Sequence, residues 1–227
     1  QIVGIANTPE CLKAFGTGSV NGALWTVFTE MQLYIVLGIF YPGLKKMKTG
    51  HWTALLILFA AVNLACGEMA QNLDGIIPKL IERIFLPYAL WFFIGVVCYQ
   101  KRQSVLPVLK KICLPMLVIY LAVKYAGLKL PGYYTDILTG TVLPFVVIGG
   151  GYCLPAVRLR TDLSYGIFLY HWIILNILVH YDLINKLQWP LGVALFLTGS
   201  VTAAAVSGRL GKALQNLLRI TGNSQCR

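Results

Sequence analysis

Long apolar runs separated by short polar stretches dominate the sequence. At about 1.5 Å rise per residue, a run of roughly 20 apolar residues crosses the hydrocarbon core of a bilayer as a helix. The pattern predicts seven helices, over residues 24–41, 52–66, 84–99, 112–126, 136–157, 162–181 and 191–208. We therefore expect an all-α fold, a polytopic transmembrane helical bundle that forms a single membrane domain over residues 1–227.

Glycine, proline and small residues divide these segments. Breaks in residues 1–23 exclude a long helix there, and residues 67–82 are expected to form a loop. Pro144 and Gly149–Gly151 interrupt the fifth predicted helix, so it should bend or let a neighbouring backbone come close. Small residues between Gly199 and Ser207 predict tight packing of the last helix. The basic tail, residues 209–227, is expected to lie along a membrane surface.

The first predicted helix carries a carboxylate, Glu30, about two turns from its start. A charged side chain at that depth costs roughly 2.5 kcal/mol or more unless a polar environment receives it. Thr26, Glu30 and Tyr34 are four residues apart, so they form a polar stripe on one face of the helix. The functional interpretation is a polar site that other helices enclose. The structural alternative is a carboxyl kept neutral, or paired with an arginine of another helix.

A second polar group lies in the sixth predicted helix, between Asp162 and Trp172. The imidazole of His171 has the chemistry of a base or a hydrogen-bond donor, and the alternative is a buried histidine bonded to a neighbouring helix. Ser164 and Tyr165 have two interpretations, helix capping and ligand binding, of which capping is favoured. The remaining polar residues of this kind, Asn176, His180 and His51, are interpreted as packing or interfacial residues.

Composition excludes a soluble globular protein, because 57% of the residues are hydrophobic, only 12% are charged and the mean hydropathy is +0.71. The net charge of +11 is explained by the positive-inside rule, and nucleic-acid binding is not expected. Thirteen lysines and arginines follow the odd-numbered predicted helices and five lie on the other side, which predicts a cytoplasmic C-terminus. The six cysteines occur singly, without metal-ligand spacing, so no metal site is expected and a Cys11–Cys66 disulfide is not favoured.

Two stretches resemble signatures of acyltransferase family 3, the integral-membrane O-acyltransferases. Residues 21–26 read Asn-Gly-Ala-Leu-Trp-Thr and are followed by Glu30, similar to the family's Asn-Gly-Ser-Leu-Trp-Thr and Glu. Residues 163–172 read Leu-Ser-Tyr-Gly-Ile-Phe-Leu-Tyr-His-Trp, similar to a late Ser-Tyr-Gly-Ile-Tyr-Leu-x-His-Trp segment, and residues 92–95 resemble a mid-domain helix. Ala23 in place of serine and the absence of a Glu-x-Pro ending near residues 207–210 depart from the family pattern.

The resemblance implies a ten-helix bundle with both termini inside, of which these seven helices would be the C-terminal portion. The family's early histidine and cytoplasmic arginines would then lie before Gln1, and we expect the 227-residue chain alone to be inactive. The implied reaction transfers an acyl group, acetyl above all, from acyl-CoA to a hydroxyl of a surface or exported glycan. The implied location is the plasma membrane, with acyl-CoA as a donor substrate and no bound cofactor.

Within this family, Glu30 and His171 are the expected catalytic residues. The expected substrate-binding residues are Asn21, Trp25, Tyr34, Ser164 and Tyr165. Two alternatives remain open: a fragment of a transporter or flippase for a glycan or lipid, and a non-catalytic membrane subunit. A transporter should contain an internal repeat, and residues 24–99 and 112–208 show none.

Overall fold

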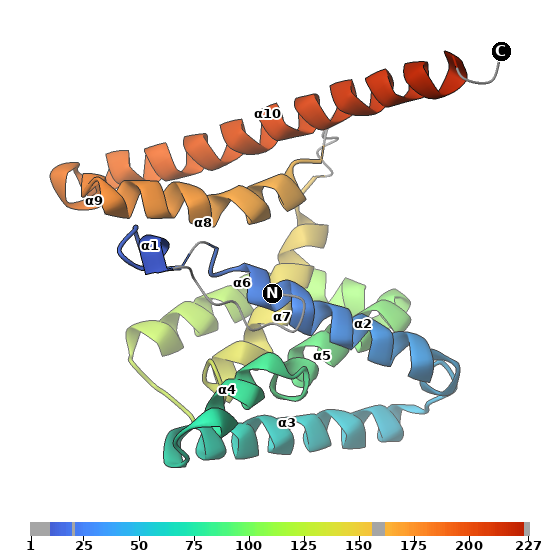
Figure 1. Cartoon of the computed structure of the whole chain (residues 1–227). Helices are drawn as coiled ribbons and strands as arrows, with labels where there is room; N and C mark the ends of the chain where they lie inside the picture. The colour runs from blue at the N-terminus through green and yellow to red at the C-terminus, as the bar shows by residue number, and fades with distance from the viewer. Residues whose placement is uncertain (1–9, 20, 156–161, 225–227) are drawn as a thin grey trace. The chain divides into compact units, whose positions relative to one another are not determined.

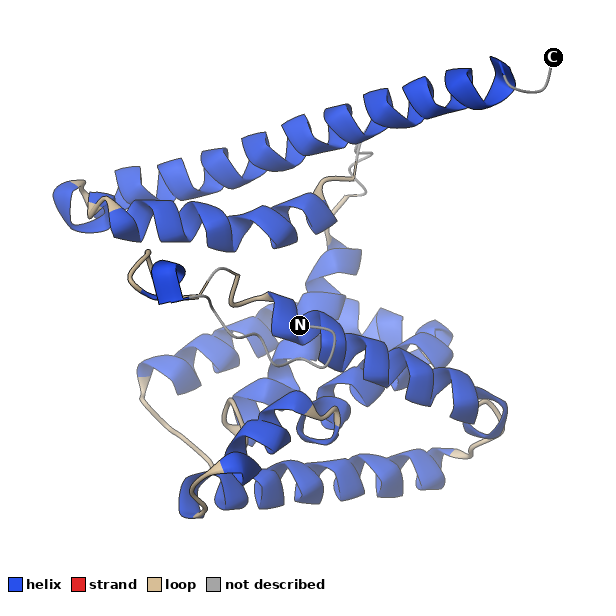
Figure 2. Ribbon diagram, in the orientation of Figure 1, coloured by secondary structure: helices blue, strands red, loops and turns tan. Residues whose placement is uncertain are grey.

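The computed structural model describes residues 10–19, 21–155 and 162–224, and within them every regular element is helical (Figures 1 and 2). The expected all-α class is confirmed. The elements are α1 (Glu10–Lys13), α2 (Leu24–Leu44), α3 (Thr49–Asn72), α4 (Ile76–Arg83), the 3-10 turn η1 (Leu86–Tyr88), α5 (Ala89–Gln100), α6 (Arg102–Tyr125), α7 (Ile137–Cys153), α8 (Ser164–His180), α9 (Leu183–Lys186) and α10 (Trp189–Ser224).

Four helices in the described part of the chain are long and apolar enough to cross a bilayer: α2, α3, α6 and residues 189–212 of α10. A fifth span is present if α4 and the segment Leu86–Gln100, bent by 53° where they meet, count as one. The apolar helices α7 and α8 have 17 residues each, just below the usual length. These helices make the chain an integral membrane protein of four or five clear spans, although each of the seven predicted segments contains a helix in its described residues.

Three predicted boundaries are wrong. Residues 67–82 are mostly helical, because α3 continues to Asn72 and α4 begins at Ile76. The fourth predicted helix starts ten residues earlier, so Lys110 and Lys111 lie inside α6 and not in a loop. The predicted tail is part of α10, which continues to Ser224. In each case polar residues mark where the apolar face ends, while the backbone hydrogen bonding of the helix continues beyond it.

The chain divides into two compact units: unit 1 contains Gln1–Val27 and Arg158–Arg227, and unit 2 contains Phe28–Val157. The core of unit 2 has two apolar clusters, formed by Leu33, Leu44, Trp52, Ala89 and Phe93 and by Leu90, Ile94, Cys98 and Leu109. Asn63, fully buried on α3, donates its amide N–H to the Pro87 carbonyl at 2.8 Å and accepts from the Tyr133 N–H at 3.2 Å. These two bonds tie α3 to η1 and to the segment before α7.

Helices α6 and α7 of unit 2 pack at very short range. A Cβ added at Gly149 would lie 2.7 Å from the Cys113 Cβ and 3.0 Å from the Leu109 carbonyl oxygen. A neighbouring backbone was predicted to come close to residues 149–151. This is confirmed at Gly149, which approaches the backbone of α6 at Leu109. Helix α7 remains one continuous helix through Pro144.

Unit 1 is built on the helix pair α8 and α10, which lie side by side (Figure 1). A Cβ added at Gly166 of α8 would lie 2.8 Å from the Ala204 Cβ of α10. A Cβ added at Gly199 of α10 would lie 3.2 Å from the Ile174 side chain of α8. The small-residue face predicted for the last helix thus forms this interface.

Candidate functional site

The segment that precedes α2 is attached to α8 by hydrogen bonds from a buried asparagine. Asn176, 2% exposed, accepts from the backbone N–H of Thr17 at 2.8 Å and from its hydroxyl at 2.7 Å. Its side-chain amide donates to the Ser19 carbonyl at 2.7 Å. Gly16 has φ +60° and an added Cβ would lie 2.7 Å from the Asn176 backbone, so only glycine fits there. The packing role expected for Asn176 is confirmed.

The two motif segments of the sequence meet in unit 1, although they are 148 residues apart. The Asn21 amide donates to the Leu169 carbonyl at 2.8 Å, and its oxygen accepts from the Ala23 N–H at 3.1 Å. Asn21 therefore joins the start of α2 to α8 with both of its polar atoms. A Cβ added at Gly22 would lie 2.5 Å from the Trp172 ring, which explains why the position next to Asn21 has no side chain. The substrate-binding role of Asn21 stays a prediction.

The tautomer of His171 follows from its partners on α8. Its Nδ1 lies 2.7 Å from the Phe168 carbonyl oxygen and 3.2 Å from the Ile167 carbonyl oxygen. A carbonyl oxygen only accepts, so Nδ1 carries a proton, and in the neutral ring Nε2 holds the lone pair. This arrangement fixes the ring orientation and gives His171 the chemistry of a proton acceptor at Nε2.

Trp172, the next residue, adds a hydrogen-bond donor. Its ring lies nearly perpendicular to that of His171, at 86° with 6.2 Å between the ring centroids. The indole Nε1–H is buried and has no hydrogen-bond partner among the described residues. A buried donor left unpaired costs about 1–3 kcal/mol. A proton acceptor and an unpaired donor thus lie on adjacent residues, and the Trp172 ring contacts Gly22.

Ser164 and Tyr165 are the first two residues of α8. The Asp162 carboxylate accepts from the Ser164 hydroxyl at 2.6 Å and from its backbone N–H at 2.9 Å. These hydrogen bonds hold the pKa of Asp162 below its ordinary value. The Asp162 carboxylate, and not the Ser164 side chain, therefore accepts from the first N–H group of α8, and Tyr165 is 70% exposed. Their ligand-binding roles stay predictions.

Glu30 and Tyr34 belong to unit 2, where both side chains are exposed. The Tyr34 hydroxyl donates to Glu30 Oε1 at 2.8 Å, and the Tyr34 ring meets the Phe92 ring edge-on at 5.8 Å. Within the described structure, no arginine or lysine forms an ion pair with Glu30. The polar stripe predicted on α2 is thus a hydrogen-bonded Glu–Tyr pair. Trp25, at the start of α2 in unit 1, is half-buried.

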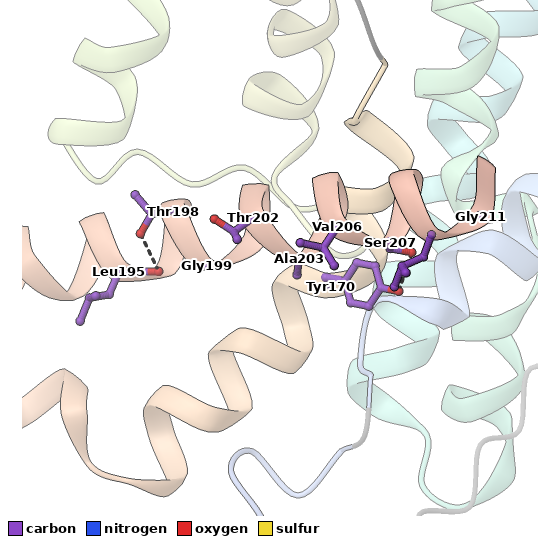
Figure 3. Close-up of a pocket in the computed structure, with 10 residues that line it drawn as sticks. Tyr170, Leu195, Thr198, Gly199, Thr202, Ala203, Val206, Ser207 and Gly211 are labelled. Atoms are coloured by element: carbon purple, nitrogen blue, oxygen red, sulfur yellow. Dashed lines mark hydrogen bonds between the residues drawn. The ribbon is translucent and has the colours of Figure 1, made fainter. Parts of the chain in front are cut away.

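A groove of about 860 Å³ lies on the same helix pair as His171. It is lined by Tyr170 from α8 and by one face of α10, from Leu195 to Gly211 (Figure 3). Its surface is apolar except for hydroxyls, and the Tyr170 hydroxyl donates to Ser207 at 2.9 Å. No cluster of three or more potential metal ligands is found among the residues that the structure describes.

Comparison with known proteins decides the family. A sequence profile described as "Acyltransferase domain" matches residues 2–209. The chain belongs to acyltransferase family 3. An O-acetyl transferase of Shigella phage Sf6 is 26% identical over 71% of this chain and 47% of its own length. Nodulation protein 10 of Rhizobium leguminosarum bv. viciae is 27% identical over 86% of this chain and 55% of its own length.

This acyltransferase chain spans about half the length of the curated relatives it matches. No solved structure gives a significant match. The family assignment confirms the resemblance drawn from residues 21–30 and 163–172. The family assignment supports acyl transfer. It does not identify the acyl donor, the acceptor or the particular membrane that holds the protein.

Sequence reasoning missed two features of this site. One is the contact between Gly22 and Trp172, and the signal for it was the glycine of the Asn-Gly-Ala-Leu-Trp-Thr motif. The other is the identity of the groups that Asn176 binds: a packing role was expected from its lone amide in an otherwise apolar stretch of helix, but not its bonds to Thr17 and Ser19. Neither signal alone identifies its partner, since the partner lies more than a hundred residues away.

Proposed function

We propose that the whole protein to which this acyltransferase chain belongs transfers an acyl group, acetyl above all, from acyl-CoA to a hydroxyl of a glycan at the cell surface or in export. The contact of the two motif segments in unit 1 carries this proposal. It brings Asn21 and Gly22 against the stretch of α8 that contains His171 and Trp172. The name of the phage relative, an O-acetyl transferase, supports the acetyl group and an oxygen acceptor.

The chemistry needs a group that removes the proton of the acceptor hydroxyl and a donor that stabilises the oxyanion formed at the thioester carbonyl. In our proposal, His171 Nε2 accepts or relays the proton, since Nδ1 is bound to backbone carbonyls. The unpaired Trp172 N–H is a candidate donor to the oxygen that becomes negative. The thiolate of coenzyme A then leaves and takes up a proton. Glu30, hydrogen-bonded to Tyr34, supports the polar site on α2.

The histidines of α8 offer a matched test in the full-length protein. His171→Gln removes the Nε2 base, whereas His180→Gln changes an exposed ring that packs at a tilt against Phe15 and meets Tyr181 edge-on. Membrane vesicles are supplied with radiolabelled acetyl-CoA, and base-labile acetate on the glycan is measured. General base contributions are typically 10²–10⁴-fold, so we expect a loss of about 100-fold or more in His171→Gln and near-normal transfer in His180→Gln.

Transfer by His171→Gln within about threefold of the parent, at equal protein level in the membrane, would remove His171 from the mechanism. Absence of any acetyl transfer by the unmodified full-length protein, with a range of glycan acceptors and acyl-CoA donors, would contradict the proposed function itself.

A second substitution tests the polar pair on α2. Glu30→Gln keeps the size of the side chain and its ability to accept from Tyr34, but removes the charge. We expect lower acetyl transfer with unchanged membrane abundance. Glu68→Gln is the matched control, because Glu68 is an exposed acid of α3 that bonds only to Asn72 within its own helix. Equal transfer by the two variants would exclude Glu30 from the site.

A further inference from the structure

Two cysteine side chains of unit 2 lie in direct contact across α6 and α7. The Sγ atoms of Cys113 and Cys153 are 3.2 Å apart, although the residues are 40 positions apart in the sequence. Both thiols also lie near one acceptor, the Lys110 carbonyl oxygen, at 3.6 Å from Cys113 Sγ and 3.3 Å from Cys153 Sγ. Among the residues that the structure describes, neither thiol has a stronger hydrogen-bond partner than this shared carbonyl.

The helix packing explains why these thiols meet. Gly149 and Cys153 are four residues apart on one face of α7, and Leu109 and Cys113 are four residues apart on one face of α6. The missing side chain of Gly149 lets α7 approach the Cys113 Cβ and the Leu109 carbonyl. One helical turn further along, the same approach brings Cys153 to Cys113. The contact therefore depends on the rigid packing of two helices and not on a loop.

Both thiols of the pair reach the surface of the described structure. Cys153 is the last residue of α7 and is exposed, while Cys113 is partly exposed. Lys110 and Lys111, both exposed, lie within one turn of Cys113 on α6, so two charged side chains lie beside the thiols. The other described thiols differ: Cys66 and Cys98 are buried, and Cys11 belongs to unit 1.

We propose that Cys113 and Cys153 form a redox-active dithiol that is oxidised to an intramolecular disulfide by exchange with a low-molecular-weight disulfide such as oxidised glutathione. The more exposed Cys153 thiolate attacks the glutathione disulfide, one glutathione leaves as a thiol, and a mixed disulfide forms on Cys153. The Cys113 thiolate then attacks the Cys153 sulfur, and the second glutathione leaves. Two protein thiols lose two electrons and two protons, and one disulfide is reduced to two thiols.

The step requires only a small movement. A disulfide bond is about 2.05 Å long, so the sulfurs must approach by about 1.2 Å from their 3.2 Å contact. Closure replaces the weak contacts with the Lys110 carbonyl by a covalent link between α6 and the end of α7. The disulfide would therefore lock the helix interface that Gly149 already makes short.

The test uses the full chain in lipid nanodiscs, equilibrated with glutathione buffers of increasing oxidised fraction. Samples are quenched with acid, and free thiols are counted by the gel shift that a polyethylene glycol maleimide produces. We expect the unmodified chain to lose two thiols together. Tryptic mapping should then show the peptide of residues 112–124 linked to that of residues 130–158. Cys11→Ser, the matched control, should lose the same two thiols.

The single variants separate a dithiol from independent cysteines. In Cys113→Ser, exchange should stop at a glutathione adduct on Cys153, and in Cys153→Ser the internal disulfide should be absent. The proposal is overturned if the unmodified chain keeps all its thiols across the buffer series, if its thiols are lost one at a time as stable glutathione adducts, or if peptide mapping links Cys113 or Cys153 to any other cysteine.

Discussion

The attachment of the first described segment to α8 leads to a quantitative prediction for Asn176→Leu. Leucine has a similar size, so the packing of the site changes little, but all three hydrogen bonds with Thr17 and Ser19 are lost. The backbone N–H of Thr17 and the carbonyl of Ser19 then have no partner from α8, whereas the Thr17 hydroxyl, on an exposed residue, can turn to water.

Each lost bond to a partly buried group costs about 1–1.5 kcal/mol, so the two backbone groups together weaken the attachment by about 2–3 kcal/mol. Since each ~1.4 kcal/mol is a factor of ten, local opening of residues 15–19 should become roughly 30- to 150-fold more frequent. Thr17→Val removes the hydrogen bond from the Thr17 hydroxyl to Asn176 and should raise the frequency of local opening of residues 15–19 about fivefold. Asn185→Leu removes an exposed bond to Asp182 and should have no effect on this segment.

Hydrogen–deuterium exchange of the full chain in detergent, read by mass spectrometry for the peptide that contains Thr17, measures this opening. The unmodified chain should protect that amide, and protection should fall in the order Asn185→Leu, Thr17→Val, Asn176→Leu. A change of less than about threefold in Asn176→Leu, with α8 still folded, would refute the assignment of the attachment to these bonds.

Three further predictions concern the stability of unit 2. Gly149→Ala should lower the free energy of unfolding by about 1–3 kcal/mol through overpacking, whereas Gly150→Ala, with open space around an added Cβ, should leave it unchanged or raise it slightly; thermal melts in detergent compare the two. Asn63→Leu should cost about 2–3 kcal/mol, because one buried and one partly buried backbone partner lose their bonds, and a loss below about 0.5 kcal/mol would contradict this. Burial raises the pKa of Asp136, but hydrogen bonds from Thr139 and the Lys124 ammonium outweigh it, so the pKa lies below its usual value. The carboxylate therefore stabilises the fold above about pH 4 and loses this effect as the pH falls through its lowered pKa, so Asp136→Asn should destabilise the chain at pH 7, and the difference from the unmodified chain in melting experiments should shrink as the pH falls below about 4.

The helices of this chain could be predicted from the sequence because their apolar runs are long. Each of the seven predicted segments contains a helix in its described residues, and the four or five spans follow from the same hydropathy. Their ends could not be predicted in three places. Residues 68–72 and 76–83 mix charged and apolar side chains, and such a segment forms a helix or a loop according to what packs against it. The sequence pattern does not contain that information.

For the candidate site, the motif residues were identified and their contacts were not. Asn21 was expected at the rim of a site, and the structure shows that its amide bonds to Leu169 and Ala23. The lone histidine of the motif was recognised, but its tautomer depends on carbonyls of its own helix turn. The Cys113–Cys153 contact was also missed, since it requires the packing angle of two helices that are separated by a loop. Such contacts arise from tertiary packing and have no local pattern.

The attachment of residues 17–19 to α8 also sets an order of events during synthesis. Thr17 leaves the ribosome 159 residues before its partner Asn176, an interval of roughly 8 to 30 s at about 5–20 residues per second. All of Phe28–Val157 is synthesised in that interval, so its helices can insert and pack first. Residues 17–19 remain without their partner on α8 during that interval, which gives the insertion machinery or a chaperone time to bind them.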